Sequence, residues 1–387
     1  MGASPNRPLA GLTLAALLLA GCTGGSAPAP PSGSPGAGPG SGPATGPGSG
    51  PSGAPTDGPT LLGVVATGLR SPWGLAFLPD GGALVSERDT GAIRRVGPDG
   101  TVTTVGTVPD VAAGGEGGLL GIALPPRFPD PPYLYAYLTA RTGGGGRVNR
   151  LVRLRYDGGG ALGPAQTLLD GVPAAGLHDG GRIAFGPDGM LYVATGDATR
   201  AELAQDPASP AGKILRLTPD GGVPPGNPFP GSPVWSLGHR NVQGLAWDSA
   251  GRLWASEFGT SRYDEVNLIR PGGNYGWPEV EGPGGGGRFV EPAVVWRPAE
   301  ASPSGVAVVG DALYVAALRG QRLWRVPLPP AGGTVPAGPP QPLLAGTYGR
   351  LRTVAAAPDG TLWVVTSNTD GRGAPRADDD RILRLRP

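Results

Sequence analysis

Short apolar stretches separated by turns recur along residues 61–387. Each copy has an apolar strand, a tight turn and a second apolar strand, as in Gly74–Gly81 followed by Ala83–Val85. The turns of the six copies centre near Asp80, Pro129, Asp188, Ala250, Gly310 and Asp359, at spacings of 49 to 62 residues. Such spacings are typical of propeller blades with long loops. The pattern therefore predicts an all-β, six-bladed β-propeller, with a β-sandwich as the alternative.

Arginine-rich strands such as Ile93–Val96 and Leu323–Val326 lie between the copies and alternate as half-buried strands do. We expect the C-terminal strand Ile382–Leu385 to share a blade with a strand near Leu61–Val65, which would close the ring. Helical periodicity is essentially missing from residues 61–387. The 72 glycines and 48 prolines of the chain suit turns and loops rather than helices.

The first 60 residues have a different composition. The apolar run Leu12–Ala20 is too short to span a bilayer, and it leads into Gly21-Cys22, which resembles a bacterial lipobox. An ordinary secretory signal with a chance cysteine is the alternative. We predict a lipoprotein signal peptide over 1–22, lipidation of Cys22, and an extracytoplasmic protein anchored to the cell membrane. Residues 23–60, almost entirely Gly, Pro, Ser, Ala and Thr, predict a disordered tether before the domain at 61–387.

Charge and composition exclude several classes of partner. The net charge is +1 and no basic stripe stands out, so the sequence argues against nucleic-acid binding. Two histidines and one cysteine argue against a zinc or copper centre. A Ca²⁺ site stays open, because carboxylates and backbone carbonyls suffice to bind this ion.

One of the two histidines, His178, stands just before a strand, a Pro-Asp-Gly turn and a second strand that ends in Thr-Gly-Asp. An imidazole at the mouth of a hairpin is well placed for proton transfer. Asp197, at the end of the same hairpin, could accept a hydrogen bond from it and select its tautomer. A surface histidine on a turn is the alternative.

Two further segments combine polar side chains with glycine. Gly238–Leu245 brings together His239, Arg240, Asn241 and Gln243, and a guanidinium can bind a carboxylate or a quinone oxygen. The alternative is a network that ties a loop together, which we favour for His239. Ser256–Thr260, followed by Asp264–Asn267, combines acidic residues with a glycine, which suits Ca²⁺, although a solvated turn is the simpler interpretation.

Arg350 and Arg352 fall on one face of a strand, where two like charges need an anion or solvent. The glycine-rich segment Gly114–Leu120 is followed by no helical pattern, so a dinucleotide-binding turn is disfavoured. No Gly-x-Ser-x-Gly elbow precedes a helix, which argues against a serine hydrolase.

Taken together, these segments resemble the soluble pyrroloquinoline quinone (PQQ)-dependent sugar dehydrogenases, the aldose or glucose/sorbosone dehydrogenase family. The resemblance covers residues 70–387 almost continuously. It rests on five short motifs in the family's order: Pro72–Gly81, Gly117–Leu120, Gly180–Arg182, Gly238–Asn241 and Asn274–Pro278.

The resemblance implies a propeller that carries PQQ and Ca²⁺ over its channel mouth and oxidises aldose sugars to lactones, passing electrons to an acceptor that the sequence does not identify. By position, His178 matches the catalytic base and Asp197 its orienting carboxylate. Arg240 matches the arginine that polarises the quinone, and Asn241 its neighbour at the cofactor. The remaining matches are the Ca²⁺-binding carbonyls of Gly259 and Thr260, the PQQ-carboxylate pair Arg350 and Arg352, and, more loosely, Trp296 near the cofactor.

Three positions depart from the family pattern. Thr260 stands where proline is often found, but a backbone carbonyl survives that change. Glu116 stands where some members carry glutamine, and Arg319 where a cofactor-binding lysine is common. Arginine can still pair with a PQQ carboxylate, which keeps Arg319 a candidate cofactor contact. Glu116 is a candidate cofactor contact by its position in the family pattern.

Two other functions stay open at this point. A lipid-anchored propeller could bind sugars or proteins without catalysis, because fold does not determine function. A propeller lactonase could use Ca²⁺ without a quinone. The set His178, Arg240, Arg350 and Arg352 favours the dehydrogenase, because a simple binding protein has no evident need to combine these residues.

Overall fold

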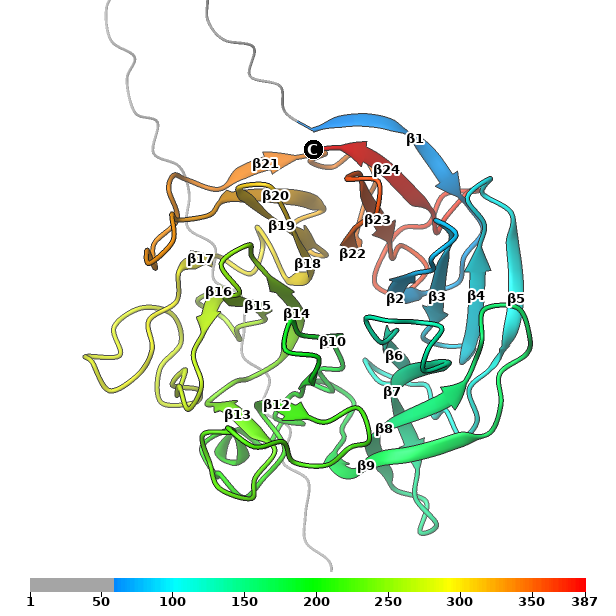
Figure 1. Cartoon of the computed structure of the whole chain (residues 1–387). Coiled ribbons are helices and arrows are strands. Elements are labelled where there is room, and N and C mark those ends of the chain that lie inside the picture. The colour runs from blue at the N-terminus through cyan, green and yellow to red at the C-terminus, as the bar shows by residue number, and fades with distance from the viewer. Residues whose placement is uncertain (1–58) are drawn as a thin grey trace, which may run out of the picture. The chain divides into compact units, whose positions relative to one another are not determined.

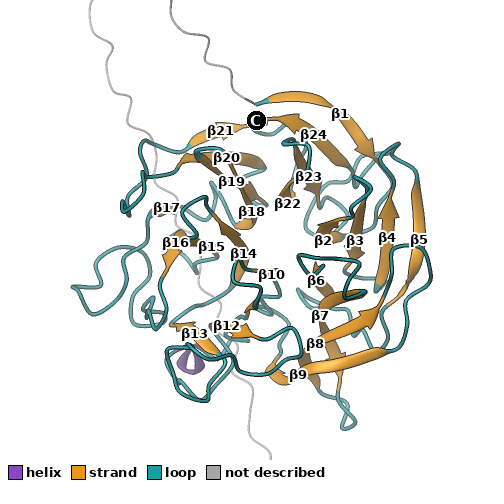
Figure 2. Ribbon diagram, in the orientation of Figure 1, coloured by secondary structure: helices purple, strands orange, loops and turns teal. Residues whose placement is uncertain are grey.

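The computed structural model describes residues 59–387. The predicted signal peptide, Cys22 and all but the last two residues of the predicted tether lie outside these residues. In the described part, no helix is long and apolar enough to cross a membrane. The one helical element there is the single 3₁₀ turn η1 (Ala201–Ala204), and Figure 2 shows that strands and loops make up the rest.

The strands form six four-stranded antiparallel sheets arranged around a central axis, which confirms the predicted six-bladed propeller (Figure 1). The first three blades comprise, in order, β2 (Pro72–Phe77), β3 (Ala83–Glu87), β4 (Ala92–Val96) and β5 (Val102–Thr107); β6 (Leu119–Ala123), β7 (Tyr133–Arg141), β8 (Arg147–Arg155) and β9 (Ala165–Pro173); and β10 (Ile183–Phe185), β11 (Leu191–Ala194), β12 (Lys213–Leu217) and β13 (Val234–Leu237).

The fourth and fifth blades follow the same order. They comprise β14 (Val242–Trp247), β15 (Leu253–Glu257), β16 (Asp264–Ile269) and β17 (Val294–Trp296); and β18 (Pro303–Val309), β19 (Ala312–Ala317), β20 (Arg322–Pro327) and β21 (Gln341–Leu343). In each of these five blades the first strand along the chain is innermost, and in the sixth blade the innermost strand is β22, so β2, β6, β10, β14, β18 and β22 surround the axis (Figure 1).

The sixth blade joins the two ends of the domain. It consists of β22 (Leu351–Ala356), β23 (Leu362–Thr366), β24 (Ile382–Arg386) and β1 (Thr60–Ala66). The outer strand β1 pairs with β24, with Leu61 opposite Leu385 and Val64 opposite Leu383. The predicted ring closure is therefore confirmed. Closure leaves no broken blade whose interior strand edges would be open to solvent.

The Pro-Asp-Gly turns have a local physical cause. The carboxylate of Asp80 accepts a hydrogen bond from Gly82 N at 2.9 Å, and that of Asp188 accepts one from Met190 N at 3.1 Å. Between them stand Gly81 and Gly189, at φ values of +83° and +74° that other residues rarely adopt. These turns join the first and second strands of a blade at one end of the ring. The loops that enter each first strand therefore lie at the opposite end.

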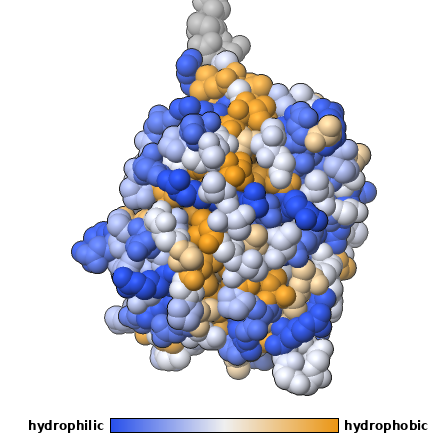
Figure 3. All heavy atoms as spheres, turned by 90° about the vertical axis from the view of Figure 1, so that its right-hand side faces the viewer, coloured by the Kyte–Doolittle hydropathy of each residue, from blue (hydrophilic) through white to orange (hydrophobic). Residues whose placement is uncertain are grey.

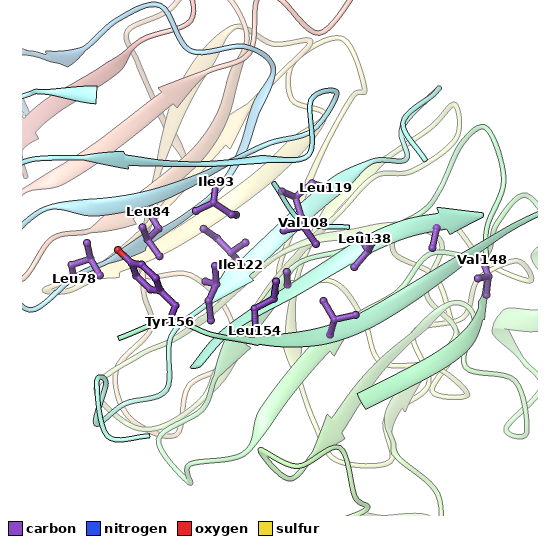
Figure 4. Close-up of a cluster of buried hydrophobic side chains, with 14 residues drawn as sticks. Leu78, Leu84, Ile93, Val108, Leu119, Ile122, Leu138, Val148, Leu154 and Tyr156 are labelled. Carbon is purple, nitrogen blue, oxygen red and sulfur yellow. The ribbon is translucent and has the colours of Figure 1, made fainter. Parts of the chain in front are cut away.

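Apolar side chains fill the spaces between neighbouring blades. Figure 4 shows one such cluster, in which Leu84 and Ile93 of the first blade pack against Ile122, Leu138 and Leu154 of the second. Burying each of these side chains stabilises the fold by about 1.5–3 kcal/mol. The outer side seen in Figure 3 is a mosaic of hydrophilic and hydrophobic residues, as on most protein surfaces.

Candidate active site

The candidate residues gather at the end of the ring opposite the Pro-Asp-Gly turns. Glu116, His178, Arg240, Asn241 and Arg350 precede the first strands of their blades, and Asp197, Gly259, Thr260 and Arg319 follow the second strands. In an antiparallel blade both positions lie at the same end. Five blades thus bring these residues to one mouth of the central channel.

His178 and Asp197 form a close pair. His178 Nδ1 lies 2.8 Å from Asp197 Oδ1, and Asp197 is 1% exposed. Asp197 also accepts hydrogen bonds from Thr199 N at 2.7 Å and from Trp277 Nε1 at 2.8 Å. Because a carboxylate can only accept, it holds the proton of the neutral imidazole on Nδ1 and leaves Nε2 free to accept another. The pair has the arrangement of a general base with its orienting acid.

The backbone at His178 is held in an unusual conformation. Its φ is +63°, in the left-handed region that costs a non-glycine residue about 1–3 kcal/mol. Two hydrogen bonds maintain it: His178 N donates to Glu116 Oε2 at 2.9 Å, and Ala198 N donates to His178 O at 3.2 Å. Gly196 lies directly beneath, where any Cβ would collide with the His178 carbonyl. The surroundings thus determine where the imidazole lies.

Glu116 connects three separate loops. Besides His178 N, its carboxylate accepts hydrogen bonds from Asn241 Nδ2 at 3.3 Å and from Arg372 Nη1 at 3.1 Å. Burial raises the pKa of Glu116, but the hydrogen bonds from His178 N and Arg372 outweigh this, and the pKa lies below its ordinary value. Asn241 is fully buried and accepts from Gly180 N at 3.1 Å. An ionised Glu116 therefore supports the loop that carries His178.

Arg240 lies between the proposed base and the proposed cation loop. Its Nη1 donates to the carbonyls of Gly259 at 2.6 Å and Phe258 at 3.2 Å, and its guanidinium lies over the ring of Trp277, 5.4 Å from the centroid. Its Nε is buried without a hydrogen-bond partner. Burial lowers the pKa of Arg240, against the opposing effect of Asp197. Trp277 contacts both Asp197 and Arg240 and so joins them into one unit.

Arg350 and Arg352 are both buried and converge on one carboxylate, that of Asp370. Arg350 Nη2 lies 3.0 Å from Asp370 Oδ2, and Arg352 Nη2 lies 3.8 Å from the same oxygen. Arg352 also donates to Gln243 Oε1 at 2.7 Å, but its Nε has no partner. Burial lowers the pKa of Arg352 to about 9, which Asp370 only partly opposes. Two guanidinium groups share one carboxylate, so the pair can accept another anion.

The proposed cation loop depends on backbone oxygens. Within residues 59–387 there is no group of three or more His, Cys, Asp or Glu side chains that could hold a metal ion. Gly259 N donates to Asp264 Oδ1 at 2.9 Å, and Glu281 Oε1 accepts from four successive N–H groups, Thr260 to Tyr263. Burial raises the pKa of Asp264 to about 6. The loop is thus held rigidly between two acidic side chains, with the Gly259 carbonyl turned toward Arg240.

Three predicted residues are placed apart from this unit or act differently. Trp296 is 6% exposed in the core between two blades, where its ring stacks on Trp324 with centroids 5.4 Å apart. The structure gives Trp296 this packing role, because outer strand β17 turns its side chain toward the next blade. Arg319 is exposed on the loop after β19. His239 is buried between Ser236 and Glu257 at 2.8 Å each and ties its loop together, as expected.

Sequence reasoning missed Asp370 and Trp277 as parts of the site, and it placed Gln243 in a candidate segment without finding its contact with Arg352. Trp277 belonged to a recognised motif, Asn274–Pro278, but nothing local indicated that its indole N–H reaches Asp197, 80 residues away. Asp370 carried no signal at all. The roles of Asp370 and Gln243 come from packing between blades.

Asp179, next to His178, provides a test of the site's electrostatics. It is 1% exposed, and burial raises its pKa to about 6 despite hydrogen bonds from Asn149 and Ala175 N. The folded state therefore binds this proton more tightly than the unfolded state, and stability falls as pH rises from about 4 through 6. We expect Asp179→Asn to gain stability relative to the native protein across this range, by up to about 3 kcal/mol.

Denaturant unfolding at pH 4.5, 6 and 8 measures this difference. The exposed Asp130→Asn substitution is the matched control for the loss of one carboxylate. If the difference in unfolding free energy between Asp179→Asn and the native protein is the same at all three pH values, burial does not raise the pKa of Asp179.

Comparison with known proteins agrees with this arrangement. The model of the Glucose / Sorbosone dehydrogenase family matches residues 69–383. The chain is 31% identical over 338 residues to aldose sugar dehydrogenase YliI of Escherichia coli (strain K12), a match that covers 78% of this chain and 89% of that protein. It is 38% identical over 250 residues to quinoprotein glucose dehydrogenase B of Acinetobacter calcoaceticus, covering 57% of this chain but only 52% of that protein.

A solved structure gives a similar result. The PQQ-bound form of the aldose sugar dehydrogenase of Streptomyces coelicolor superposes with a TM-score of 0.82 at 55% identity, over 85% of this chain and 98% of that one. The family model covers well over half of the chain, and the matched region includes every candidate site residue. The chain therefore belongs to the glucose/sorbosone dehydrogenase family.

Proposed function

We propose that this protein is a quinoprotein that oxidises the anomeric carbon of aldose sugars to lactones, with PQQ and Ca²⁺ as cofactors. One observation carries the proposal: the hydrogen-bonded pair of His178 and buried Asp197 lies at the same channel mouth as Arg240, Arg350 and Arg352. A base that faces concentrated positive charge suits a reaction in which a proton leaves the substrate and negative charge develops on the cofactor.

The donor set fits a polyanionic quinone. Arg240 and Arg352 each keep a buried Nε without a partner, and Arg350 and Arg352 share the single carboxylate of Asp370. Buried guanidinium groups need compensating charge, and a planar carboxylate matches their geometry. We assign Arg350 and Arg352 to cofactor carboxylates and Arg240 and Asn241 to the quinone. We also assign exposed Arg319, and Glu116 with its hydrogen bonds to three loops, to the cofactor.

His178 Nε2 is the group that accepts the proton of the anomeric hydroxyl. Asp197 keeps the proton of the neutral ring on Nδ1 and stabilises the imidazolium formed when Nε2 is protonated. Bound PQQ would supply the acceptor for the hydride of the same carbon, so that the hemiacetal loses one proton and one hydride and becomes a lactone. The supported backbone at His178 holds the imidazole in place throughout, which limits the reorganisation that the reaction requires.

The carbonyls of Gly259 and Thr260 would hold Ca²⁺. The Gly259 carbonyl now accepts a hydrogen bond from Arg240, and a cation at this oxygen would repel the guanidinium. Loading of the metal would therefore free Arg240 Nη1 to bind the quinone. The nearby carboxylates of Asp264 and Glu281 supply negative charge that favours a cation at this loop.

Titration of the purified protein with PQQ, followed by calorimetry with and without Ca²⁺, tests the proposal. We expect binding of one PQQ per chain in the presence of Ca²⁺ and at least ~10-fold weaker binding in excess chelator, because the metal both contributes contacts and releases Arg240. The loaded protein should oxidise aldoses with an artificial dye as electron acceptor.

Two results would contradict the proposal. One is the absence of PQQ binding together with the absence of dye-linked oxidation of any aldose tested. The other is Ca²⁺-dependent lactone hydrolysis that proceeds without PQQ, which would make the protein a lactonase instead.

A further inference from the structure

The central channel contains a cavity at the end away from the candidate active site. Its volume is about 420 Å³, and all six innermost strands contribute to its wall. The lining residues nearest the Pro-Asp-Gly turns include Phe185, Trp247, Val308 and Ala356, which are partly or fully exposed. Those farther along the axis, Gly305 and Thr353, are buried. The cavity therefore opens at the turn end and closes toward the middle of the ring.

Arg182 closes the inner end of this cavity. Its guanidinium crosses the channel, donating from Nε to Gln243 O at 2.8 Å and from Nη2 to Thr353 Oγ1 at 3.0 Å. It lies over the ring of Trp73, 4.2 Å from the centroid. These contacts reach three other blades, so Arg182 forms a floor between the cavity and the candidate site. Arg352, one residue nearer the candidate site than Thr353, contacts the same Trp73 ring.

Arg182 is a buried cation without a counter-ion. It is 8% exposed, and in residues 59–387 no carboxylate lies within ion-pair distance of it. Its Nη1 donates to no protein group in this part of the chain, whereas Nε and Nη2 are both satisfied. Burial, and then the like charge of Arg352, lower the pKa of Arg182 to about 9. An unpaired buried charge costs several kcal/mol, which an anion in the cavity would offset.

We infer that this cavity is a second ligand site, which takes a small carboxylate with an apolar body whose anionic end pairs with Arg182. The guanidinium supplies the charged donor that a carboxylate matches. The side chains of Ile122, Phe185, Leu245 and Val306 supply an apolar wall for the rest of the molecule. The volume falls within the range of about 300–1,000 Å³ that small-molecule sites occupy. This site is separate from the proposed PQQ site and does not depend on it.

Calorimetric titration of the full chain with octanoate tests the inference, and octanamide is the neutral probe of equal length. The protein is first saturated with PQQ and Ca²⁺, so that Arg350 and Arg352 are occupied. We expect one octanoate per chain and at least ~10-fold weaker binding of octanamide, because the amide cannot form the charge-assisted pair with Arg182.

Two substitutions locate the probe. Ala356→Trp places a large side chain at the cavity mouth, far from the candidate site, and should weaken octanoate binding by at least ~10-fold. Ala250→Trp makes the same change on an exposed turn at the same end of the ring, outside the cavity, and should leave binding unchanged. Arg182→Gln should remove the preference for octanoate over octanamide. Because Arg182→Gln could fail to fold, the comparison of Ala356→Trp with Ala250→Trp is the deciding one.

Three results would overturn the inference. The first is the absence of octanoate binding. The second is equal binding by Ala356→Trp and Ala250→Trp. The third is binding that PQQ abolishes, which would place the probe at Arg350 and Arg352 instead. The comparison of the two alanine variants can also be made without PQQ, so failure of the proposed dehydrogenase function leaves this test intact.

Discussion

Replacement of His178 by alanine will lower the turnover of aldose oxidation by at least ~100-fold, the usual contribution of a general base. Without Nε2 at this position, no group within the unit formed by Asp197, Trp277 and Arg240 can take the hydroxyl proton. In the variant, each oxygen of Asp197 still accepts a hydrogen bond, Oδ1 from Thr199 N at 2.7 Å and Oδ2 from Trp277 Nε1 at 2.8 Å. Turnover should be measured with saturating PQQ, Ca²⁺ and dye.

PQQ affinity provides the control for this substitution. The imidazole pairs with Asp197 and not with the arginines, so PQQ binding to His178→Ala should stay within about threefold of the native value. Added imidazole should restore part of the lost turnover by occupying the space of the side chain. If turnover is unchanged in His178→Ala, the proton goes to another group and the assignment of the base is wrong.

Replacement of Arg352 by glutamine will weaken PQQ binding by ~10- to 100-fold, the effect of losing about 1.5–3 kcal/mol in hydrogen bonds to a charged group. Arg352 has a buried Nε without a partner and only a 3.8 Å approach to Asp370, so much of its donor capacity is left for a ligand. Arg352→Lys keeps the charge but loses the planar guanidinium. Its PQQ affinity should lie between those of the native protein and of Arg352→Gln. Calorimetry measures all three affinities.

The unfolding temperature distinguishes a role of Arg352 in PQQ binding from a role in stabilising the fold. Arg352 is buried beside the like charges of Arg350 and Arg88, so the glutamine variant should unfold at the same temperature as the native protein or above it. Arg155→Gln, a change at an exposed arginine on β8, is the matched control and should leave PQQ affinity unaltered. Unchanged affinity in Arg352→Gln would remove this residue from the cofactor site.

The chain order of the loops explains why much of the candidate site could be predicted. His178 and Asp197 stand at the two ends of a single hairpin, 19 residues apart, so local pairing alone brings them to the same mouth. Arg240 precedes the next innermost strand and therefore reaches the same end. The Arg350–Asp370 ion pair could not be predicted in this way, because its acid lies in the long loop 367–381, which has no periodic pattern.

Trp296 shows the limit of such reasoning from position. It precedes a loop at the same end as the candidate site, yet its ring packs against Trp324 in the core. Alternation along a strand indicates which side chains are buried, but it does not distinguish burial between blades from burial at the channel. Only the order of strands within the blade decides between them, and β17 is outermost.

By itself, the sequence determined the six-bladed ring, its closure through β1 and β24, and the end of the ring at which the polar loops meet. The blades and the end at which their polar loops meet follow from interactions between near neighbours in the chain: two-residue alternation, Asp–backbone hydrogen bonds in turns, and glycine where φ is positive. The closure pairs strands at opposite ends of the domain, and it could be predicted because both terminal segments have the pattern of a strand. Tertiary structure alone decided that Trp277 joins Asp197 to Arg240, that Glu116 supports His178 from 62 residues away, and that Arg182 lies unpaired across the channel. These contacts depend on how blades pack against one another, and local patterning carries no information about the side chain that a distant blade will present.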